Sequence, residues 1–386
     1  MTDNLEGAEL VELVKRVFSP GPKDNAMAFL VDLPDAELED NEQWRARREM
    51  VLEWASALAP LTDTLGMNVH LYLYRNTRTN NADLPDGAWA HRFGHLPADA
   101  DEVDPEIMEP FDSIFRSHTI FIAPTELSCT APLKLAAAGY GFRAATMPGF
   151  TMNMIDSLRL DYVEINRRVN LLKRLMDSAE EAVIDFVVDG DRAHSLILDL
   201  RNRQAHASGG LFPEPGTAGN LPSGEAYIVP YEGEDDYSRS SGVLPVQFGD
   251  EIVLYSIDEN RAVMVQGEGA AAVAEREKLA QEPAYGNLAE LGLGVLGDFG
   301  IEPTGVILLD EKLGLHIAFG RSDHFGGTVG ADDFSRPEAV VHIDRVYIPQ
   351  TQPGISLKRA VLKYKDGGIT EIIRDDDYTV DFGGSG

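Results

Sequence analysis

The chain is poor in cysteine and has no long apolar run. Cys129 is its single cysteine, so no disulfide can form within the chain, and a reducing compartment is expected. No apolar stretch reaches the roughly 18 residues that a membrane span requires. The first residues, MTDNLEGAEL, lack the basic and apolar regions of a signal peptide. We therefore expect a cytoplasmic protein with no membrane partner.

Basic side chains are scarce relative to acidic ones. Lys and Arg together number 33 against 64 Asp and Glu, which gives a formal net charge of −31. A surface with this charge repels phosphate backbones, so nucleic acid is not an expected partner. An acidic, lysine-poor surface suits a salt-rich cytoplasm, but it equally describes an ordinary acidic protein.

Several catalytic signatures are also absent. The chain has no GxxxxGK[ST], HExxH, CxxC or GxSxG motif, which disfavours P-loop, zincin, zinc-ribbon and serine-hydrolase chemistry. Gly292, Gly294 and Gly297 spell GxGxxG. No clear βαβ unit surrounds them, so we do not expect a dinucleotide site there.

The hydrophobic pattern changes character halfway along the chain. Strand and helix patterns alternate in the first half, which predicts an α/β domain with a mainly parallel sheet. A long helical pattern at 156–181 ends this half, and short strands separated by Gly, Pro and Asp then dominate. We expect an α/β domain at 1–180, followed at 181–386 by an α+β domain that is rich in short strands and holds the site.

The second half contains carboxylates and imidazoles at the ends of apolar segments. These segments read NLPSGE, AELG, LLDEKLGLHIAFG and VVHID. Carboxylate oxygens and imidazole nitrogens held at strand ends suit catalytic divalent cations. The set is too acidic for one structural zinc, and it suits two catalytic cations. The candidate ligands are Glu225, Glu290, Glu311, His316, His342 and Asp344.

Most of these candidates have a structural alternative. Glu290 is the hardest to explain otherwise, because apolar residues flank it and a buried unpaired Glu is rare. His342 and Asp344 would share one face of a strand, where they could form a hydrogen-bonded core pair. His316 taken alone could be a core histidine.

Other polar residues near these segments are open to two interpretations. Glu311 could be a turn acid paired with Lys312, and Glu225 could open a strand at the surface. Asp310 is expected to belong to the turn. His324, in SDHFGG, could face the site or cap a loop. The remaining histidines show no ligand spacing and are interpreted as structural: His70, His91, His95, His118, His194 and His206.

Four segments, in their order and spacing, resemble the thermophilic aminopeptidase family: NLPSGE, AELGLG, LDEKLGLHIAFG and HID. This family comprises metallopeptidases of the aminopeptidase T and aminopeptidase S type. The likeness is clearest from about residue 160 to 345 and rests on α/β layout alone before that. It implies release of N-terminal residues from peptides by water activated between two divalent cations, zinc, cobalt or manganese. It also implies a homodimer. Matched motif by motif, the cation ligands would be Glu225, Glu290, Glu311, His316, His342 and Asp344.

The chain departs from the family pattern at two places. Leu315 stands where the family has threonine before the histidine of HIAFG. The family also has a tyrosine, thought to assist catalysis, about seven residues after that histidine, where this chain has Asp323 and His324. Either His324 replaces that tyrosine as a donor to the tetrahedral intermediate, or the chemistry differs.

The expected catalytic residues are Glu311 and His324. Glu290 or Asp344 would bridge the cations. Glu311, or an oxygen of Glu225 that binds no cation, would take the proton of the water and return it to the leaving amine.

Two other functions remain open. Proteins that resemble this family include ring-opening dioxygenases of dihydroxypyridines with one non-haem iron, and His316, His342 and Asp344 would supply the two imidazoles and one carboxylate that hold Fe(II). The third possibility is a non-catalytic protein that keeps a metal for stability.

Overall fold

The computed structural model describes residues 4–383, and their contacts divide into two compact units. The first comprises residues 4–166, Ser208–Ser223 and Thr304–Leu309. The second comprises Arg167–Ala207, Gly224–Pro303 and 310–383. The domain boundary expected near residue 180 stays a prediction, because contacts do not test whether either part folds independently.

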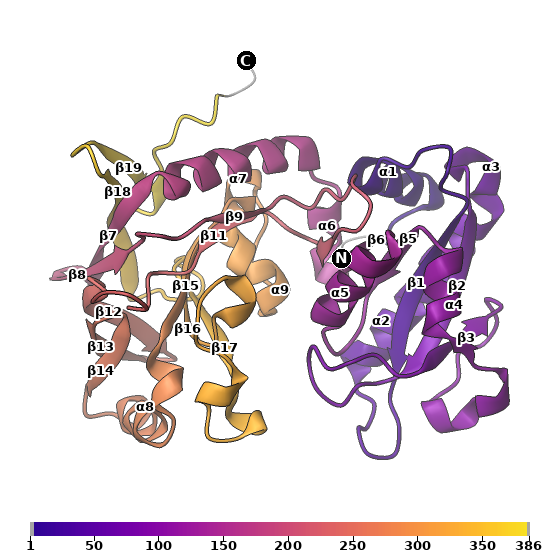
Figure 1. Ribbon diagram of the computed structural model, residues 1–386, viewed down its shortest axis with the longest axis horizontal. Coiled ribbons are helices and arrows are strands. Elements are labelled where there is room, and N and C mark those ends of the chain that lie inside the picture. The colour runs from indigo at the N-terminus through magenta and orange to yellow at the C-terminus, as the bar shows by residue number, and fades with distance from the viewer. Residues whose placement is uncertain (1–3, 384–386) are drawn as a thin grey trace. The chain divides into compact units, whose positions relative to one another are not determined.

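The first unit is built on a seven-stranded, mainly parallel sheet (Figure 1). Its strand order is β10-β6-β5-β1-β2-β3-β4, in which neighbours from β10 to β2 pair in parallel and β3 and β4 are antiparallel. The strands are β1 (Ala26–Leu33), β2 (Asn68–Arg75), β3 (Gly87–His91), β4 (Glu109–Pro110), β5 (Ile120–Ala123), β6 (Arg143–Thr146) and β10 (Ala218–Asn220). The helices are α1 (Gly7–Phe18), α2 (Glu42–Leu58), α3 (Thr62–Leu65), α4 (Phe111–Ser117), α5 (Thr130–Tyr140) and α6 (Ile155–Leu158).

Local sequence accounts for these elements. Every residue of β1, AMAFLVDL, is buried, as expected of a strand inside a parallel sheet covered on both faces. The side chain of Asn41 caps α2 by accepting the backbone N–H of Trp44 at 2.8 Å. Gly141 ends α5 with a φ of 80°, a conformation that glycine adopts without strain.

The second unit carries two strand-rich sheets. The five-stranded sheet has the order β17-β16-β15-β11-β9, and the eight-stranded sheet has the order β14-β13-β12-β8-β7-β18-β19-β20. The strands are β7 (Ala179–Val188), β8 (Arg192–Asp199), β9 (His206–Ser208), β11 (Glu225–Ile228), β12 (Ser241–Phe248), β13 (Glu251–Asp258), β14 (Arg261–Gln266), β15 (Leu288–Gly294), β16 (Leu315–Gly320), β17 (His342–Val346), β18 (Ile355–Tyr364), β19 (Ile369–Arg374) and β20 (Asp377–Tyr378). The helices are α7 (Tyr162–Asp177), which starts in the first unit, α8 (Ala270–Gln281) and α9 (Ile307–Asp310).

This architecture confirms the predicted fold class: an α/β part with a mainly parallel sheet and a strand-rich α+β part. The single helix predicted at 156–181 is wrong in its ends. Residues 155–158 form α6, α7 starts only at Tyr162, and β7 already begins at Ala179.

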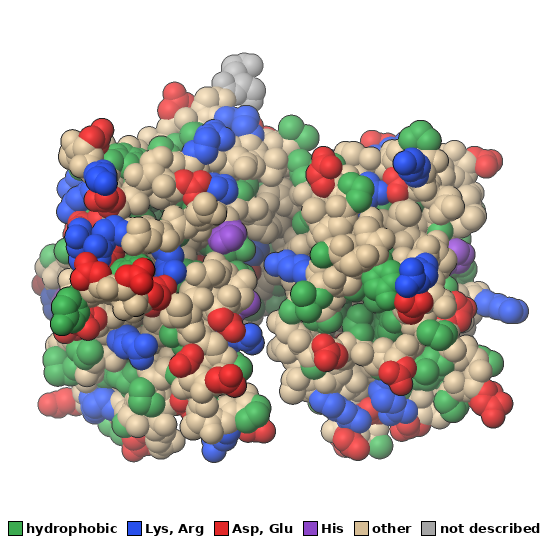
Figure 2. Space-filling view, viewed as in Figure 1, with side chains coloured by type: hydrophobic (Ala, Val, Ile, Leu, Met, Phe, Trp, Pro, Cys, Tyr) green, Lys and Arg blue, Asp and Glu red, His purple; other side chains and the backbone are tan. Residues whose placement is uncertain are grey.

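On the face shown in Figure 2, acidic side chains are distributed over both units, with basic side chains among them. The large acid excess is therefore not gathered in one patch of this face. Within residues 4–383, no helix combines the length and apolar character needed to cross a membrane.

Candidate metal centre

Five of the six predicted ligands belong to four neighbouring strands of the five-stranded sheet, β11, β15, β16 and β17, whose positions Figure 1 shows. Opposite residues in an antiparallel pair project from the same face of a sheet. Glu290 on β15 pairs with Ala318 on β16, and Ala318 pairs with Asp344 on β17. Glu225, the first residue of β11, pairs with Gly294, two residues beyond Gly292 on β15. The register therefore puts five predicted ligands on one face: Glu225, Glu290, His316, His342 and Asp344.

These five side chains form two groups that share Glu290. Ligand atoms of Glu225, Glu290 and His316 lie within 4.8 Å of one another, and the same holds for Glu290, His342 and Asp344. Oε1 of Glu290 lies 3.2 Å from Nε2 of His316, and Oε2 lies 3.5 Å from Nε2 of His342. The two oxygens of one carboxylate thus face two different imidazoles.

Both imidazoles are oriented by backbone carbonyls. Nδ1 of His316 lies 3.2 Å from the carbonyl oxygen of Gly314, and Nδ1 of His342 lies 2.8 Å from that of Arg321. A carbonyl can only accept, so each Nδ1 carries the hydrogen. When the ring is neutral, this tautomer lets each Nε2 bind a cation, the arrangement found around metal-bound histidines.

Gly292 makes room for His316. A Cβ atom at Gly292 would lie 1.9 Å from Nε2 of His316, which is an impossible contact. A Cβ at Gly294 would lie 2.2 Å from the backbone of Lys312. Gly292 and Gly294 of the GxGxxG sequence therefore allow β15 to approach the segment that carries Lys312 and His316 closely. The sequence pattern did not indicate this role.

Lys312 is a member of the cluster that the ligand search did not predict. Its ammonium is buried, donates to Oε1 of Glu225 at 2.5 Å and contacts the carboxylate of Glu311. Glu311 thus pairs with Lys312, which is the structural interpretation given for it above. It also lies next to the ligand group, because Lys312 contacts Glu225 as well. Within residues 4–383 neither ligand group includes Glu311.

Charge balance shifts the pKa values of the cluster. Burial alone would lower the pKa of His316, but its hydrogen bond to Glu290 and the charge of Glu225 raise that pKa to about 9. Burial alone would also lower the pKa of His342. Asp344 and Glu290 nevertheless raise this pKa well above its usual range. Burial would raise the pKa of Glu290, but the two imidazoles lower it. Protons on the imidazoles and on Lys312 thus balance the acids, and cation binding would displace imidazole protons.

The donor set fits a divalent cation. It combines carboxylate oxygens with imidazole nitrogens, the ligands that zinc and related cations use in proteins. Oε2 of Glu225 is buried without a hydrogen-bond partner and lies 3.4 Å from Nε2 of His316. A buried unpaired carboxylate oxygen is costly, and a cation between these groups would relieve that cost.

His324 lies beside the cluster and outside both ligand groups. It belongs to a short 3₁₀ turn, Asp323–Phe325, and its ring centroid lies 5.6 Å from that of His342. Its side chain is 39% exposed, and its Nδ1 lies 3.4 Å from Asp323. Burial by surrounding protein, with the nearby charge of His342, lowers the pKa of His324 to about 4, so the ring is neutral near pH 7.

Glu232 anchors the loop that carries His324. Its side chain, 2% exposed, accepts from Ser322 Oγ at 2.5 Å and from the backbone N–H of Thr328 at 2.5 Å. It also accepts from Asn287 Nδ2 at 2.7 Å. Both ends of the 322–328 loop are thereby tied to one buried carboxylate. The surrounding sequence, YEGEDDY, is typical of a solvated acidic turn, so the role of Glu232 as an anchor was not predicted from the sequence.

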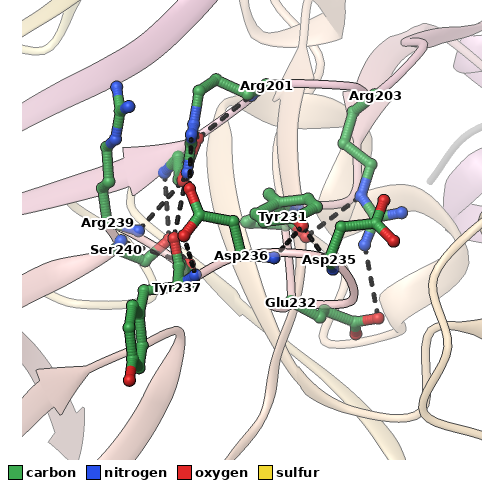
Figure 3. A network of polar contacts seen from close by, with 12 residues as sticks. Arg201, Arg203, Tyr231, Glu232, Asp235, Asp236, Tyr237, Arg239 and Ser240 are labelled. Atoms are coloured by element: carbon green, nitrogen blue, oxygen red, sulfur yellow. Dashed lines mark hydrogen bonds and ion pairs between the residues drawn. The ribbon is translucent and has the colours of Figure 1, made fainter.

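Figure 3 shows how Arg203 connects this anchor to its surroundings. The guanidinium lies 3.5 Å from Glu232 Oε2 and donates to the carbonyl oxygen of Gly326 at 3.1 Å. It lies over the ring of Tyr231, whose hydroxyl accepts from the backbone N–H of Asp235 at 2.7 Å. The acidic turn is therefore folded onto the loop anchor by a network of polar contacts.

Together, the fold and this cluster define a two-unit protein with carboxylates and imidazoles on one sheet that could hold a metal ion. No protein-family model matches the chain, and no curated protein matches it. Two solved structures share the fold over nearly their whole length. One is 2,5-dihydroxypyridine dioxygenase from Pseudomonas putida KT2440, with a TM-score of 0.61 and 13% identity over 97% of this chain and 98% of that one. The other is wild-type AmpT from Thermus thermophilus, with a TM-score of 0.56 and 15% identity over 97% and 99%. At these identities the likeness shows a common fold, and it supports the family resemblance only as a distant one.

Proposed function

We propose that this protein is a metal-dependent aminopeptidase that releases N-terminal residues from peptides with two divalent cations. The supporting observation is the position of Glu290, whose two oxygens face His316 and His342 at 3.2 and 3.5 Å. A carboxylate shared by two ligand groups suits a bridge between two cations. This geometry favours Glu290 over Asp344 as the bridge.

The two ligand groups supply one cation position each. One position has Glu225, Glu290 and His316, and the other has Glu290, His342 and Asp344. When bound, the cations would polarise a carbonyl and lower the pKa of a water toward about 7. Zinc, cobalt and manganese all suit these ligands.

The remaining residues move the proton. Glu311 lies in neither ligand group and is held by Lys312 next to Glu225. It would accept a proton as the water oxygen bonds to the carbonyl carbon. It would return that proton to the amine nitrogen as the C–N bond breaks. His324, on the 322–328 loop at the edge of the cluster, is one candidate donor to the developing oxyanion.

A single-iron, ring-opening dioxygenase is the second candidate. It is favoured by the fold shared with 2,5-dihydroxypyridine dioxygenase. It would need His316, His342 and Asp344 around one Fe(II). Among the described residues these three do not form one ligand group, because Glu290 lies between the two imidazoles. The geometry therefore supports the two-cation hydrolase better. A non-catalytic metal-binding protein is the remaining alternative.

Hydrolysis of aminoacyl p-nitroanilides after addition of cobalt, manganese or zinc tests the proposal. We expect turnover that needs no oxygen, and its loss in Glu290→Gln. Glu275→Gln is the matched control, because Glu275 is also buried but accepts from Tyr255 and Tyr285 outside the cluster. A wild-type protein that binds two cations and hydrolyses no aminoacyl anilide or peptide would refute the proposal. Oxygen consumption with a dihydroxypyridine would favour the dioxygenase.

We further propose a cytoplasmic protein that acts on peptides as a homodimer. The acidic composition, with a net charge of −31, supports the expectation that nucleic acid is not a partner. Sedimentation analysis of the full chain tests the dimer, since a monomer at micromolar concentration would contradict it.

A further inference from the structure

Tyr227 holds an uncommitted hydroxyl on the face of the sheet that carries the ligands. We propose that Tyr227 is a catalytic residue that donates a hydrogen bond to the substrate carbonyl oxygen as negative charge develops there. This inference rests on the proposed function. It adds a residue of β11 to the reaction that sequence reasoning did not find.

The strand register places Tyr227 in the row of His316. Tyr227 is opposite Gly292 on β15, and Gly292 is opposite His316 on β16. Glycine contributes no side chain, so no side chain stands between the phenol and the imidazole within this row. Tyr227 also lies two residues after Glu225 and therefore on the same face of β11.

Neighbouring rings fix the position of the phenol. The ring of His206 stacks on Tyr227 with centroids 5.1 Å apart and planes 23° apart. The ring of Phe325 meets it edge-on at 5.0 Å, and Phe325 lies 5.3 Å from the ring of the predicted ligand His342. Nε2 of His206 lies 3.2 Å from the carbonyl oxygen of Phe325, which ties these rings together. A donor held in this way needs little reorganisation during the reaction.

The hydroxyl of Tyr227 has no hydrogen-bond partner within residues 4–383. Three buried tyrosines of the second unit use theirs, whereas the enclosed hydroxyl of Tyr364 also lacks a partner. Tyr255 and Tyr285 donate to Glu275 at 2.7 and 2.5 Å, and Tyr347 donates to the carbonyl oxygen of Pro245 at 2.8 Å. Tyr227 is half-buried and its hydroxyl is not enclosed by protein, so this free donor is accessible to a partner supplied by a ligand.

A phenol, with its usual pKa of about 10, carries its hydrogen near pH 7 and can donate it. His324 is the competing donor, but its side chain is 39% exposed and its Nδ1 faces Asp323.

The step that Tyr227 assists can be written with all bonds accounted for. A lone pair of the water oxygen forms the bond to the carbonyl carbon, and the C=O π pair moves to oxygen, where the Tyr227 hydroxyl donates. When that pair returns, the C–N bond breaks, and the amine takes the proton that the carboxylate base removed from water. Tyr227 keeps its own proton throughout.

Tyr227→Phe tests the inference, because it removes one hydroxyl and keeps the ring stack. We expect kcat for an aminoacyl anilide to fall about 10²-fold, the usual loss of an oxyanion donor, with KM changed less than about twofold. Cation affinity, measured by calorimetry, should not change. Binding of a phosphinic dipeptide analogue should weaken by a similar factor, because its tetrahedral oxygen resembles the developing oxyanion. Tyr237→Phe, at a 75% exposed tyrosine, is the control.

The outcomes separate the two proposals. An active wild-type enzyme whose Tyr227→Phe variant keeps full kcat and analogue affinity would overturn the role of Tyr227 alone. Loss of cation binding in this variant would also overturn it, by showing a structural role. A wild-type protein that binds two cations without hydrolysing the anilide would overturn the proposed function, and the role of Tyr227 with it. A kcat loss in His324→Gln, with none in Tyr227→Phe, would assign the donor to His324.

Discussion

Two histidine pairs in this protein differ in what surrounds them. In the first unit, His70 Nδ1 lies 2.6 Å from His118 Nε2, and the rings of Tyr72 and Phe121 pack against His118. In the second unit, His316 and His342 are separated by the carboxylate of Glu290. Burial lowers the pKa of both His70 and His118, whereas carboxylates raise the pKa of His316 and His342.

The difference shows that the partners of a histidine decide its role more than its burial does. Nδ1 of His118 lies 2.9 Å from the carbonyl oxygen of Ile114, so its Nε2 is left to accept from His70. Both nitrogens of His118 are then committed to the protein. His316 commits only Nδ1 to the backbone and turns Nε2 toward Glu290 and Glu225. The first pair is a closed polar contact between the exposed His70 and the buried His118, and the second faces a candidate cation site.

Lys312→Met is expected to have the largest effect, because it removes the cationic partner of Glu225 and Glu311 in the second region. Breaking a buried ion pair typically costs about 3–5 kcal/mol, and we expect a loss of this order in the cation-free protein. Added zinc should raise the melting temperature of this variant more than that of wild type. Calorimetric unfolding with and without zinc measures both. Equal responses to zinc would show that Lys312 and the cation do not share these carboxylates.

His342→Phe and His118→Phe compare the two pairs directly. Loss of a ligand should weaken cation binding more than the roughly 10–100-fold that loss of an outer partner causes, so we expect more than about 100-fold for His342→Phe. His118→Phe should leave cation affinity unchanged. Calorimetric titration with cobalt measures both variants. A similar loss in the two would remove the distinction between the pairs.

Glu232→Gln tests the anchor of the loop beside the second pair. Hydrogen bonds to a charged group contribute about 1.5–3 kcal/mol, so the amide of Thr328 should exchange with solvent about 10–100-fold faster. Glu234→Gln, a more exposed neighbour that also pairs with Arg203, is the control. Hydrogen exchange over 322–328 is the measurement. Unchanged protection in Glu232→Gln would mean that the loop is held by other contacts.

The smallest expected effect is the contribution of His70 and His118 to the pH dependence of stability. Because the folded-state pKa of His70 and His118 is lowered, the unfolded chain binds more protons near the usual histidine pKa of about 6.5. This contribution to stability is complete above that pH and is lost as pH falls. Glu109, whose charge acts on both rings, and Tyr72 face the pair. In cation-free protein, the double variant His70→Phe, His118→Phe should show a flatter decline of melting temperature from pH 7.5 to 5.5 than wild type. An identical decline would contradict the lowered pKa values.

Patterns that depend on local sequence could be predicted. Apolar spacing predicts a helix at 8–18, which matches the ends of α1 to within one residue. Apolar patterns at 26–34 and 67–75 predict strands, and β1 and β2 lie there. The sequence TELSCTAPLKLAAAGYG also predicts a helix from residue 125, and this start is wrong because α5 begins only at Thr130. The backbone N–H groups of Glu126 and Leu127 donate instead to the buried carboxylate of Asp32 at 2.8 and 3.0 Å. A tertiary hydrogen bond overrode the local preference there.

The candidate site could be predicted only in part, since residue type and spacing indicate ligands but not register. Glu225, Glu290, His316, His342 and Asp344 were found as candidates and lie together, although their ligation stays a proposal. Lys312 was considered only as a partner of Glu311. The space at Gly292 and the place of Tyr227 opposite it depend on which residues pair across β11, β15 and β16. Nothing in the sequence of a single strand contains that information.

The most direct test of the central claim is anomalous diffraction at the cobalt edge from crystals soaked in cobalt. Two cations bridged by one carboxylate in hydrolases lie about 3.5–4 Å apart. We predict two peaks at this separation, one on each side of the Glu290 carboxylate. A single peak held by His342 and Asp344 without Glu290, or peaks away from all five side chains, would contradict the account.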